Sequence, residues 1–138
     1  MSKNIISSLK FKDYIVEEIS YKANSNFEND KVTLDFSINS DVEQIDETKF
    51  AVSLGINVFE DYQEKNYPFN MIVKITGFFE VNNVSEEVKL AFIEKNSVTI
   101  LFPYLRALIT TYTSTANIQP LILPPMNISK YIEQKYEN

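Results

Sequence analysis

The sequence of 138 residues contains no cysteine, no histidine and no tryptophan, and only two glycines. Without cysteine, the chain has no disulfide, no thiolate metal site and no cysteine nucleophile. Without histidine, it has no imidazole base, no histidine-bound metal and no serine–histidine pair. Gly55 and Gly77 are too few for a phosphate-binding loop of the known kinds. We therefore expect a protein that is not an enzyme and that has no catalytic residues, no metal site and no cofactor.

The chain also lacks long apolar runs, and acidic side chains outnumber basic ones. No stretch approaches the roughly 20 apolar residues of a membrane-spanning helix, and residues 1–12 lack the apolar core of a signal peptide. The formal net charge is -6. An acidic surface repels nucleic acid and favours basic polypeptides as partners. We expect a cytoplasmic protein that neither inserts into a membrane nor binds nucleic acid.

Four segments alternate between apolar and polar residues with the period of two that a half-buried strand requires. The predicted strands cover residues 11–23, 31–39, 49–60 and 67–81, and residues 40–48 form a polar loop. The alternation is loose in residues 11–23 and regular in the next two strands. Short links without an intervening helix favour an antiparallel meander. In the fourth strand, Phe69, Met71, Val73 and Ile75 share one face. Gly77 interrupts the pattern, which indicates a bulge or a close approach of the backbone to another element.

In the second half of the chain, apolar residues recur at the spacing of a helix. Ser85, followed by two glutamates, predicts the start of a short helix over 86–95. A longer helix is predicted over 97–116, with Pro103 either kinking it or starting its regular part. Prolines exclude a helix between Ile118 and Met126, and a last short helix follows over 127–136.

These segments predict an α+β fold, in which a four-stranded antiparallel sheet is followed by a long helix and a short C-terminal helix. The sheet precedes the helices in the chain, so parallel strand–helix–strand units are not expected. The length is typical of one domain, and we expect a single domain over residues 1–138.

The segment from Ser97 to Ser129 has one charged residue, Arg106. A surface helix normally presents a charged face to water. The long helix instead carries Ala107, Thr111 and Ser114 on the side away from its apolar stripe. A surface without charge is typical of buried interface cores. We expect these three residues to form an interface between subunits, and burial within the chain's own domain is the alternative.

The stretch from Pro120 to Pro125 is apolar, uncharged and stiffened by proline. Exposed apolar surface of this kind usually indicates binding. It predicts the rim of an apolar groove that other chains enter. The alternative is a connector that packs on the local core.

Three short runs in the chain resemble motifs of the SecB export chaperones of bacteria. They are Glu18-Ile19-Ser20-Tyr21 in the first predicted strand, Leu101-Phe102-Pro103-Tyr104 with Arg106 in the long helix, and the run from Pro120 to Ile128. Their order and spacing agree with the family from about Leu9 to Gln134.

The resemblance implies a homotetramer, a dimer of dimers that stack through the long helix. It also implies apolar grooves that bind unfolded or precursor polypeptides and keep them unfolded for export, without nucleotide or metal. The residues we expect in such a groove are Phe69, Phe78, Phe79, Tyr104, Leu121, Ile122, Leu123, Ile128 and Tyr131. For each of them, a place in the subunit's own core is the alternative, because aromatic and aliphatic side chains dominate both.

In the SecB family, an acidic face docks on the SecA motor, and Glu18 stands at a position that belongs to that face. Lys22 and Ile72 occupy positions where the family usually has glutamates, and Ala107 replaces an acid that often follows the arginine. The resemblance therefore implies that this chain holds clients more directly than it implies that the chain docks on SecA. The alternatives are a SecB-like chaperone that protects an antitoxin in a toxin–antitoxin system, a plain oligomerisation module and a hot-dog-type thioesterase.

Overall fold

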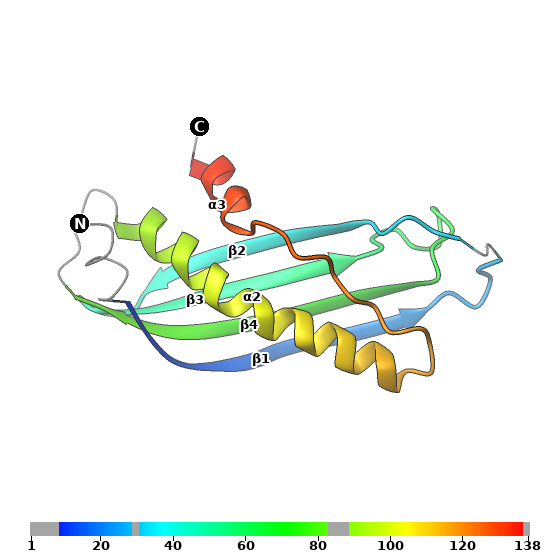
Figure 1. The fold of residues 1–138 in the computed structure, drawn as a ribbon, viewed down its shortest axis with the longest axis horizontal. Coiled ribbons are helices and arrows are strands. Elements are labelled where there is room, and N and C mark those ends of the chain that lie inside the picture. Colours follow the sequence, from blue (N-terminus) through cyan, green and yellow to red (C-terminus); the bar gives the residue numbers. More distant parts are fainter. Residues whose placement is uncertain (1–8, 29–30, 83–88, 137–138) are drawn as a thin grey trace.

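The structure, a computed structural model, describes residues 9–28, 31–82 and 89–136. Its elements in chain order are β1 (Leu9–Ala23), β2 (Phe36–Gln44), β3 (Lys49–Val58), β4 (Phe69–Val81), α2 (Lys89–Thr115) and α3 (Ser129–Tyr136). The four strands form one antiparallel sheet, and both helices lie over the same face of it (Figure 1). We call this face the inner face and the opposite one the outer face. The arrangement confirms the predicted α+β fold.

The order of the strands differs from the predicted meander. The sheet runs β1-β4-β3-β2, so β2, β3 and β4 form a meander but β1 pairs with β4. The chain between β1 and β2 therefore passes from one edge of the sheet to the other. Alternation identifies a strand and its buried face, but it carries no information on which strand lies beside it.

Two predicted boundaries are also wrong. The second strand was predicted over 31–39 but runs from Phe36 to Gln44, and its polar half pairs with β3 through Ser40↔Leu54 and Gln44↔Phe50. Strand pairing joins backbones, so an edge strand continues through polar residues. The two helices predicted over 86–95 and 97–116 are one continuous helix, and the predicted start near Ser85 lies outside the described residues.

Pro103 lies inside α2 and does not end it. Proline removes the hydrogen bond to the carbonyl four residues earlier, which belongs to Thr99. Thr99 is exposed, so its carbonyl lies where water can reach it. The loss of one hydrogen bond at an exposed position explains why Pro103 does not end the helix.

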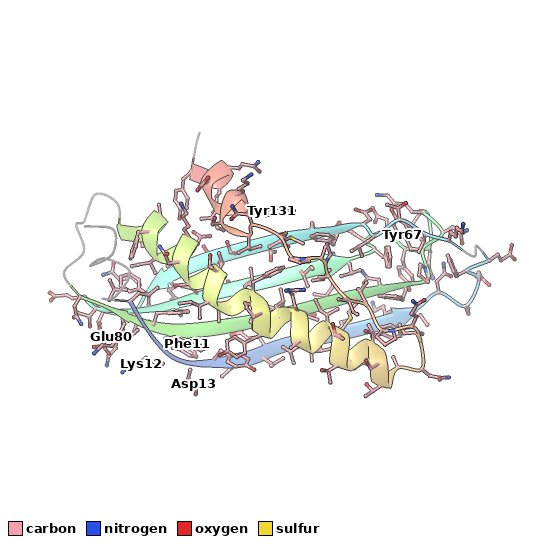
Figure 2. All side chains as sticks on the ribbon, in the orientation of Figure 1. Phe11, Lys12, Asp13, Tyr67, Glu80 and Tyr131 are labelled. Carbon is pink, nitrogen blue, oxygen red and sulfur yellow. The ribbon has the colours of Figure 1, made fainter. Side chains whose placement is uncertain are left out.

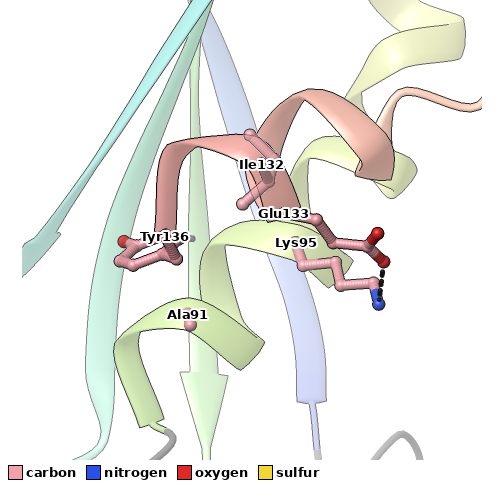
Figure 3. Close-up of a pocket in the computed structure, with 5 residues that line it drawn as sticks. All are labelled: Ala91, Lys95, Ile132, Glu133 and Tyr136. Carbon is pink, nitrogen blue, oxygen red and sulfur yellow. Dashed lines mark ion pairs between the residues drawn. The ribbon is translucent and has the colours of Figure 1, made fainter. Parts of the chain in front are cut away.

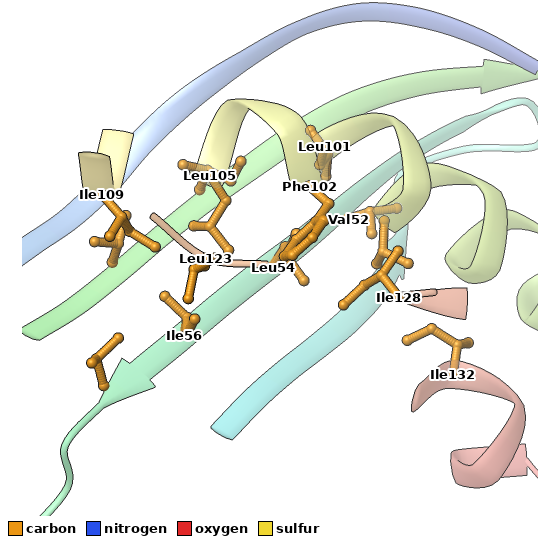
Figure 4. Close-up of a cluster of buried hydrophobic side chains, with 14 of the residues drawn as sticks. Val52, Leu54, Ile56, Leu101, Phe102, Leu105, Ile109, Leu123, Ile128 and Ile132 are labelled. Carbon is orange, nitrogen blue, oxygen red and sulfur yellow. The ribbon is translucent and has the colours of Figure 1, made fainter. Parts of the chain in front are cut away.

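The core lies between the inner face and α2 (Figure 4). Its central side chains come from β3, from α2 and from the segment after α2, and they include Leu54, Ile56, Leu101, Leu105 and Leu123. The inner-face side chains that β4 contributes include Phe69, Met71, Val73 and Ile75, as the alternation predicts.

Gly77 lies directly beneath α2, and the expected close approach is confirmed. A Cβ at this position would lie 2.7 Å from Cδ2 of Leu101 and 2.8 Å from Cε1 of Phe79. Both side chains are buried. The bulges lie in β1 instead, between Phe11 and Asp13 and between Val16 and Glu18.

We predict that Gly77→Ala lowers the free energy of unfolding by about 1–3 kcal/mol, because the added methyl group overpacks a filled core. Gly55→Ala is the matched control. Its Cβ would meet Oδ1 of Asn39, the tip of an exposed side chain that can rotate away. Urea denaturation measures both variants, and equal losses would contradict the close contact of α2 with Gly77.

Candidate functional site

The segment 118–126, which we call the strap, runs beside α2 and leads to α3 (Figure 1). Three side chains on one side of α2 hold it. Nη2 of Arg106 donates to the carbonyl of Leu123 at 2.8 Å, and Oγ1 of Thr110 donates to the carbonyl of Leu121 at 2.9 Å. The amide of Leu121 donates to Oγ1 of Thr113 at 2.8 Å.

The strap turns its side chains alternately inward and outward. Leu123 is 1% exposed and belongs to the core, whereas Ile122 is 69% exposed. Leu121 packs against the core and is half-buried. This alternation is that of an extended chain. The strap therefore offers one large apolar side chain to solvent, and its neighbours fix its position.

On the other side of α2, aromatic side chains of β1 and α2 form a row that we call the aromatic flank. The ring of Tyr104 lies 4.8 Å from that of Tyr14 and 5.7 Å from that of Phe11, and the rings of Tyr21 and Tyr112 lie 5.7 Å apart. All five are half-buried or exposed. Burial, followed by the neighbouring Tyr112, raises the pKa of Tyr21, so this phenol stays neutral at physiological pH.

Four of these five residues were not among the predicted site residues, and the geometry of β1 explains why. Tyr14 and Tyr21 are seven positions apart, which in a regular strand puts them on opposite faces. The bulge between Val16 and Glu18 shifts the register, so both reach the inner face. A bulge depends on the partner strand, and loose alternation in β1 was the one signal of it in the sequence.

The side of α2 that faces away from the sheet carries Ala107, Thr111 and Ser114, and all three are exposed. Ser114 turns its hydroxyl back to the carbonyl of Thr110 at 2.7 Å. A hydroxyl bonded within its own helix has less need of water. This small-residue row is therefore exposed and without charge, and depletion of charge is typical of interface cores.

The nine predicted groove residues do not share one surface. Phe69, Phe79, Leu123 and Ile128 are buried in the core. Phe78 is a neighbour of Phe79 in β4 and therefore points to the outer face. Tyr104 belongs to the aromatic flank. Leu121, Ile122 and Tyr131 lie on the strap and α3, so the exposed candidates lie on two sides of α2. Figure 2 shows Tyr131 on α3 and Phe11 on β1 on opposite sides of α2 in that view.

A fully buried carboxylate, Glu94, joins three elements. It accepts hydrogen bonds from Oγ of Ser40 at 2.5 Å, from Nζ of Lys135 at 2.8 Å and from the hydroxyl of Tyr136 at 2.6 Å. Burial raises the pKa of Glu94, but these hydrogen bonds and the charge of Lys135 outweigh it and hold the pKa below its usual value. Burial and the bond to Glu94 raise the pKa of Tyr136 to about 12.

The Glu94 cluster fixes the end of α3 on α2 and β2. Because the pKa of Glu94 is lower in the folded state, its contribution is complete above the ordinary carboxyl pKa. The contribution is lost as the pH falls through the folded value. The cluster therefore holds α3 at neutral pH.

A second ion pair also joins the two helices. Lys95 and Glu133 lie 2.7 Å apart, with side chains 44% and 48% exposed. Beside them is a pocket of about 370 Å³ lined by Ala91, Lys95, Ile132, Glu133 and Tyr136 (Figure 3).

On the outer face, Glu18 lines a hollow of about 250 Å³ together with Ile72 and Lys74. Oε2 of Glu17 lies 3.7 Å from Nζ of Lys74. The register of β1 with β4 puts Glu18, Lys22 and Ile72 on this same face. Lys22 and Ile72, two of the three positions that depart from the SecB pattern, therefore lie on the same face as Glu18.

Chemistry-bearing groups are sparse in the part of the chain that the structure describes. Within it, no group of three or more acidic side chains is arranged to hold a metal ion. Also within it, no helix is long and apolar enough to cross a membrane.

Comparison with known proteins gives a family match over almost the whole chain. Residues 3–138 match the family described as preprotein translocase subunit SecB. An uncharacterised protein of Methanocaldococcus jannaschii is 39% identical over 125 residues, covering 88% of this chain and 81% of the relative. The protein-export protein SecB of Aromatoleum aromaticum is 28% identical over 94 residues, covering 68% of this chain and 59% of that protein. SecB of Acidithiobacillus ferrooxidans is 34% identical over 83 residues, covering 60% and 55%.

Two solved structures share the fold. The SecB-like chaperone of Mycobacterium tuberculosis, in complex with a ChAD peptide from the HigA1 antitoxin, matches with a TM-score of 0.66 at 15% identity. That match covers 90% of this chain and 91% of the chaperone. A protein of unknown function from Streptococcus agalactiae matches with a TM-score of 0.52 at 15% identity, covering 85% and 97%.

We predict that Lys135→Met lowers the free energy of unfolding by about 2 kcal/mol, because it leaves the buried Glu94 carboxylate without its cation. The expected loss is smaller than for a wholly buried ion pair, because the Lys135 side chain is 42% exposed. Water can therefore partly replace the ammonium group beside Glu94. Urea denaturation at neutral pH measures the loss.

Lys95→Met is the matched control, since it removes a lysine–glutamate pair between the same two helices. Both partners of that pair are well exposed, so the expected loss is below about 1 kcal/mol. Equal losses in the two variants would contradict the special role of the Glu94 cluster.

Proposed function

The chain belongs to the SecB family of chaperones, and we propose that it holds unfolded or precursor polypeptides in the cytoplasm and keeps them unfolded for export. The observation that carries this proposal is the exposed, uncharged apolar surface on both sides of α2. Tyr104 and Ile122, which are 38% and 69% exposed, are its most prominent members, together with Tyr131. Exposed apolar surface of this kind is typical of sites that bind other chains.

The proposed client surface consists of the strap, the adjoining part of α3 and the aromatic flank. Leu121, Ile122 and Tyr131 supply the strap side, and Tyr104 supplies the other. The buried candidates, among them Phe79 and Leu123, support these positions from the core. Each client side chain that becomes buried contributes about 1–2 kcal/mol.

Association costs about 4–15 kcal/mol in lost freedom. One subunit with a few contacts therefore binds weakly, and several sites on one assembly are needed. We propose that the assembly is a homotetramer, a dimer of dimers, in which Ala107, Thr111 and Ser114 pack against another subunit. Residues 1–138 then act as one chaperone domain in each subunit.

A second candidate function, favoured by the outer face, is protection of an antitoxin rather than delivery to SecA. Docking on SecA would use Glu18. Lys22, Ile72 and Lys74 surround that position with a cation, an apolar side chain and a second cation. Loss of acidic charge weakens electrostatic steering of a basic partner. A binding assay with purified SecA separates the two, because export requires the complex and antitoxin protection does not.

We predict that Ile122→Asp weakens suppression of client aggregation about tenfold or more, because a carboxylate would have to enter an apolar contact. Ile122 is largely exposed, so folding should be unaffected. The measurement is light scattering when a chemically denatured protein is diluted into the chaperone.

Asn39→Asp adds the same charge at an exposed site on β2 and serves as the control. Unchanged suppression by a folded Ile122→Asp variant would contradict the strap as a client surface. Absence of suppression by the unmodified chain would favour a plain oligomerisation module. Hydrolysis of acyl thioesters would favour an enzyme.

We predict that Thr111→Glu splits the assembly into smaller species, because like charges would meet across the helix interface. Thr99→Glu adds the same charge to the same helix, outside the small-residue row, and should leave the assembly intact. Sedimentation velocity measures both. An unchanged sedimentation coefficient for Thr111→Glu would place the subunit interface elsewhere.

A further inference from the structure

The strand β2 lies at one edge of the sheet, and two backbone bonds show which of its residues point to that edge. The amide of Phe59 donates to the carbonyl of Asp35 at 2.9 Å, just before β2 begins. The amide of Ile45 donates to the carbonyl of Lys49 at 2.8 Å, just after β2 ends. Bonding alternates along an antiparallel pair, so the odd-numbered residues bond to β3. The even-numbered residues point their amides and carbonyls to the edge, and they are Phe36, Ile38, Ser40, Val42 and Gln44.

Lys135 of α3 covers the middle of this edge. Its Nζ donates to the carbonyl of Ser40 at 2.9 Å and to Oε2 of Glu94 at 2.8 Å. Figure 1 shows α3 beside β2 in that view. The amide nitrogen of a neighbouring strand would lie at a similar distance from the carbonyl of Ser40. The ammonium group therefore occupies the position that the amide of an added strand needs.

A buried charge keeps Lys135 at the edge. Glu94 is fully buried, and the hydroxyls of Ser40 and Tyr136 also donate to its carboxylate. A buried carboxylate that loses its cation is strongly unfavourable. If Lys135 left the edge, Glu94 would be in that state. The Glu94 cluster therefore keeps the ammonium group on the carbonyl of Ser40.

Without Lys135, the edge of β2 would match the same edge of a second copy. Each outward residue has both an amide and a carbonyl, because β2 contains no proline. A two-fold axis at Ser40 would pair Ile38 with Val42 of the partner subunit. These two apolar side chains would lie on the same face, where cross-strand pairs stabilise a sheet. This register uses the whole length of β2.

The charges of β2 do not prevent this pairing. They lie on the outer face, where the same register places Asn39 opposite Asp41 of the partner subunit. It also places Ser37 opposite Glu43 of the partner subunit. Each acid would thus face a neutral side chain. Edge strands are commonly protected by lysine, by proline or by a covering helix. In β2, Lys135 and α3 provide that protection.

We propose that Lys135 blocks the edge of β2 against pairing with β2 of a second copy of this chain, so that α3 is an autoinhibitory element. A two-fold pairing would have to displace Lys135 in both copies. The edge is separate from the small-residue row of α2. Subunits that assemble through that row therefore do not go on to join through β2.

The first test opens the edge in two ways. Lys135→Met removes the ammonium group, and Glu94→Gln keeps the shape of the side chain but removes the charge that holds it. Lys135→Met should associate at least about a hundredfold more tightly than the unmodified chain, because two bonds to a charged group no longer have to be broken. Glu94→Gln should shift association in the same direction. Sedimentation velocity at several concentrations measures association, and circular dichroism checks that each variant is folded.

The second test changes the charge opposite Asp41, in both the Lys135→Met and the Glu94→Gln background. Asn39→Asp would place like charges opposite each other in two symmetric pairs and should weaken association about 2- to 30-fold. Asn39→Lys would place opposite charges there and should strengthen it by a similar factor. Thr99→Glu and Thr99→Lys make the same changes of net charge on α2 and are the matched controls. Thr99 is exposed, and both controls should leave association unchanged.

The controls separate paired strands from nonspecific aggregation, which follows net charge wherever the charge is placed. Equal effects of the substitutions at Asn39 and Thr99 would overturn the pairing through β2. So would folded Lys135→Met and Glu94→Gln variants that sediment as the unmodified chain does at every concentration. In the chain that keeps Lys135 the edge is closed, so Asn39→Lys alone should leave the sedimentation coefficient unchanged. A larger species of that variant would contradict the blocking role of Lys135.

Discussion

Leu101 of α2 fills the space that a Cβ on Gly77 would need, and the position of α2 that results determines which surfaces remain open beside the helix. Without a side chain on Gly77, the helix approaches the sheet closely and buries one stripe against the inner face. A single helix is too narrow to cover a four-stranded sheet. One side of α2 is therefore left to the strap, and the other is left to half-buried aromatic side chains of β1.

The scarcity of charged residues between Ser97 and Ser129 follows from the position of α2 over the sheet. Thr110 and Thr113 are needed to hold the strap, while Tyr104 and Tyr112 contact β1. Arg106 is the single charged residue, and its guanidinium bonds a carbonyl of the strap and lies 5.8 Å from the ring of Phe102. Most sides of α2 therefore make contacts with the strap or with β1, and a charged side chain there would weaken those contacts. In the part of the chain that the structure describes, the small-residue row stays exposed.

The strap and α3 are held by different forces. Neutral hydrogen bonds and one guanidinium hold the strap, whereas α3 depends on the buried Glu94 cluster and a few apolar contacts. A helix of eight residues is marginal by itself, so its place depends on these contacts. Ile122 and Tyr131 therefore lie on two segments that separate sets of contacts hold at neutral pH.

Periodicity alone identified the four strands, the long helix and the last helix, because each depends on neighbours a few residues away. Composition excluded the chemistry that needs cysteine or histidine, since missing residue types are visible in any sequence. The position of β1 beside β4, the bulge that brings Tyr14 and Tyr21 to one face, and the convergence of Ser40, Glu94 and Lys135 were decided only by the tertiary structure. These features depend on contacts between remote segments, for which a local pattern holds no information. The same holds for Phe79 and Leu123, whose apolar character predicted contact but not whether the core or a client makes it.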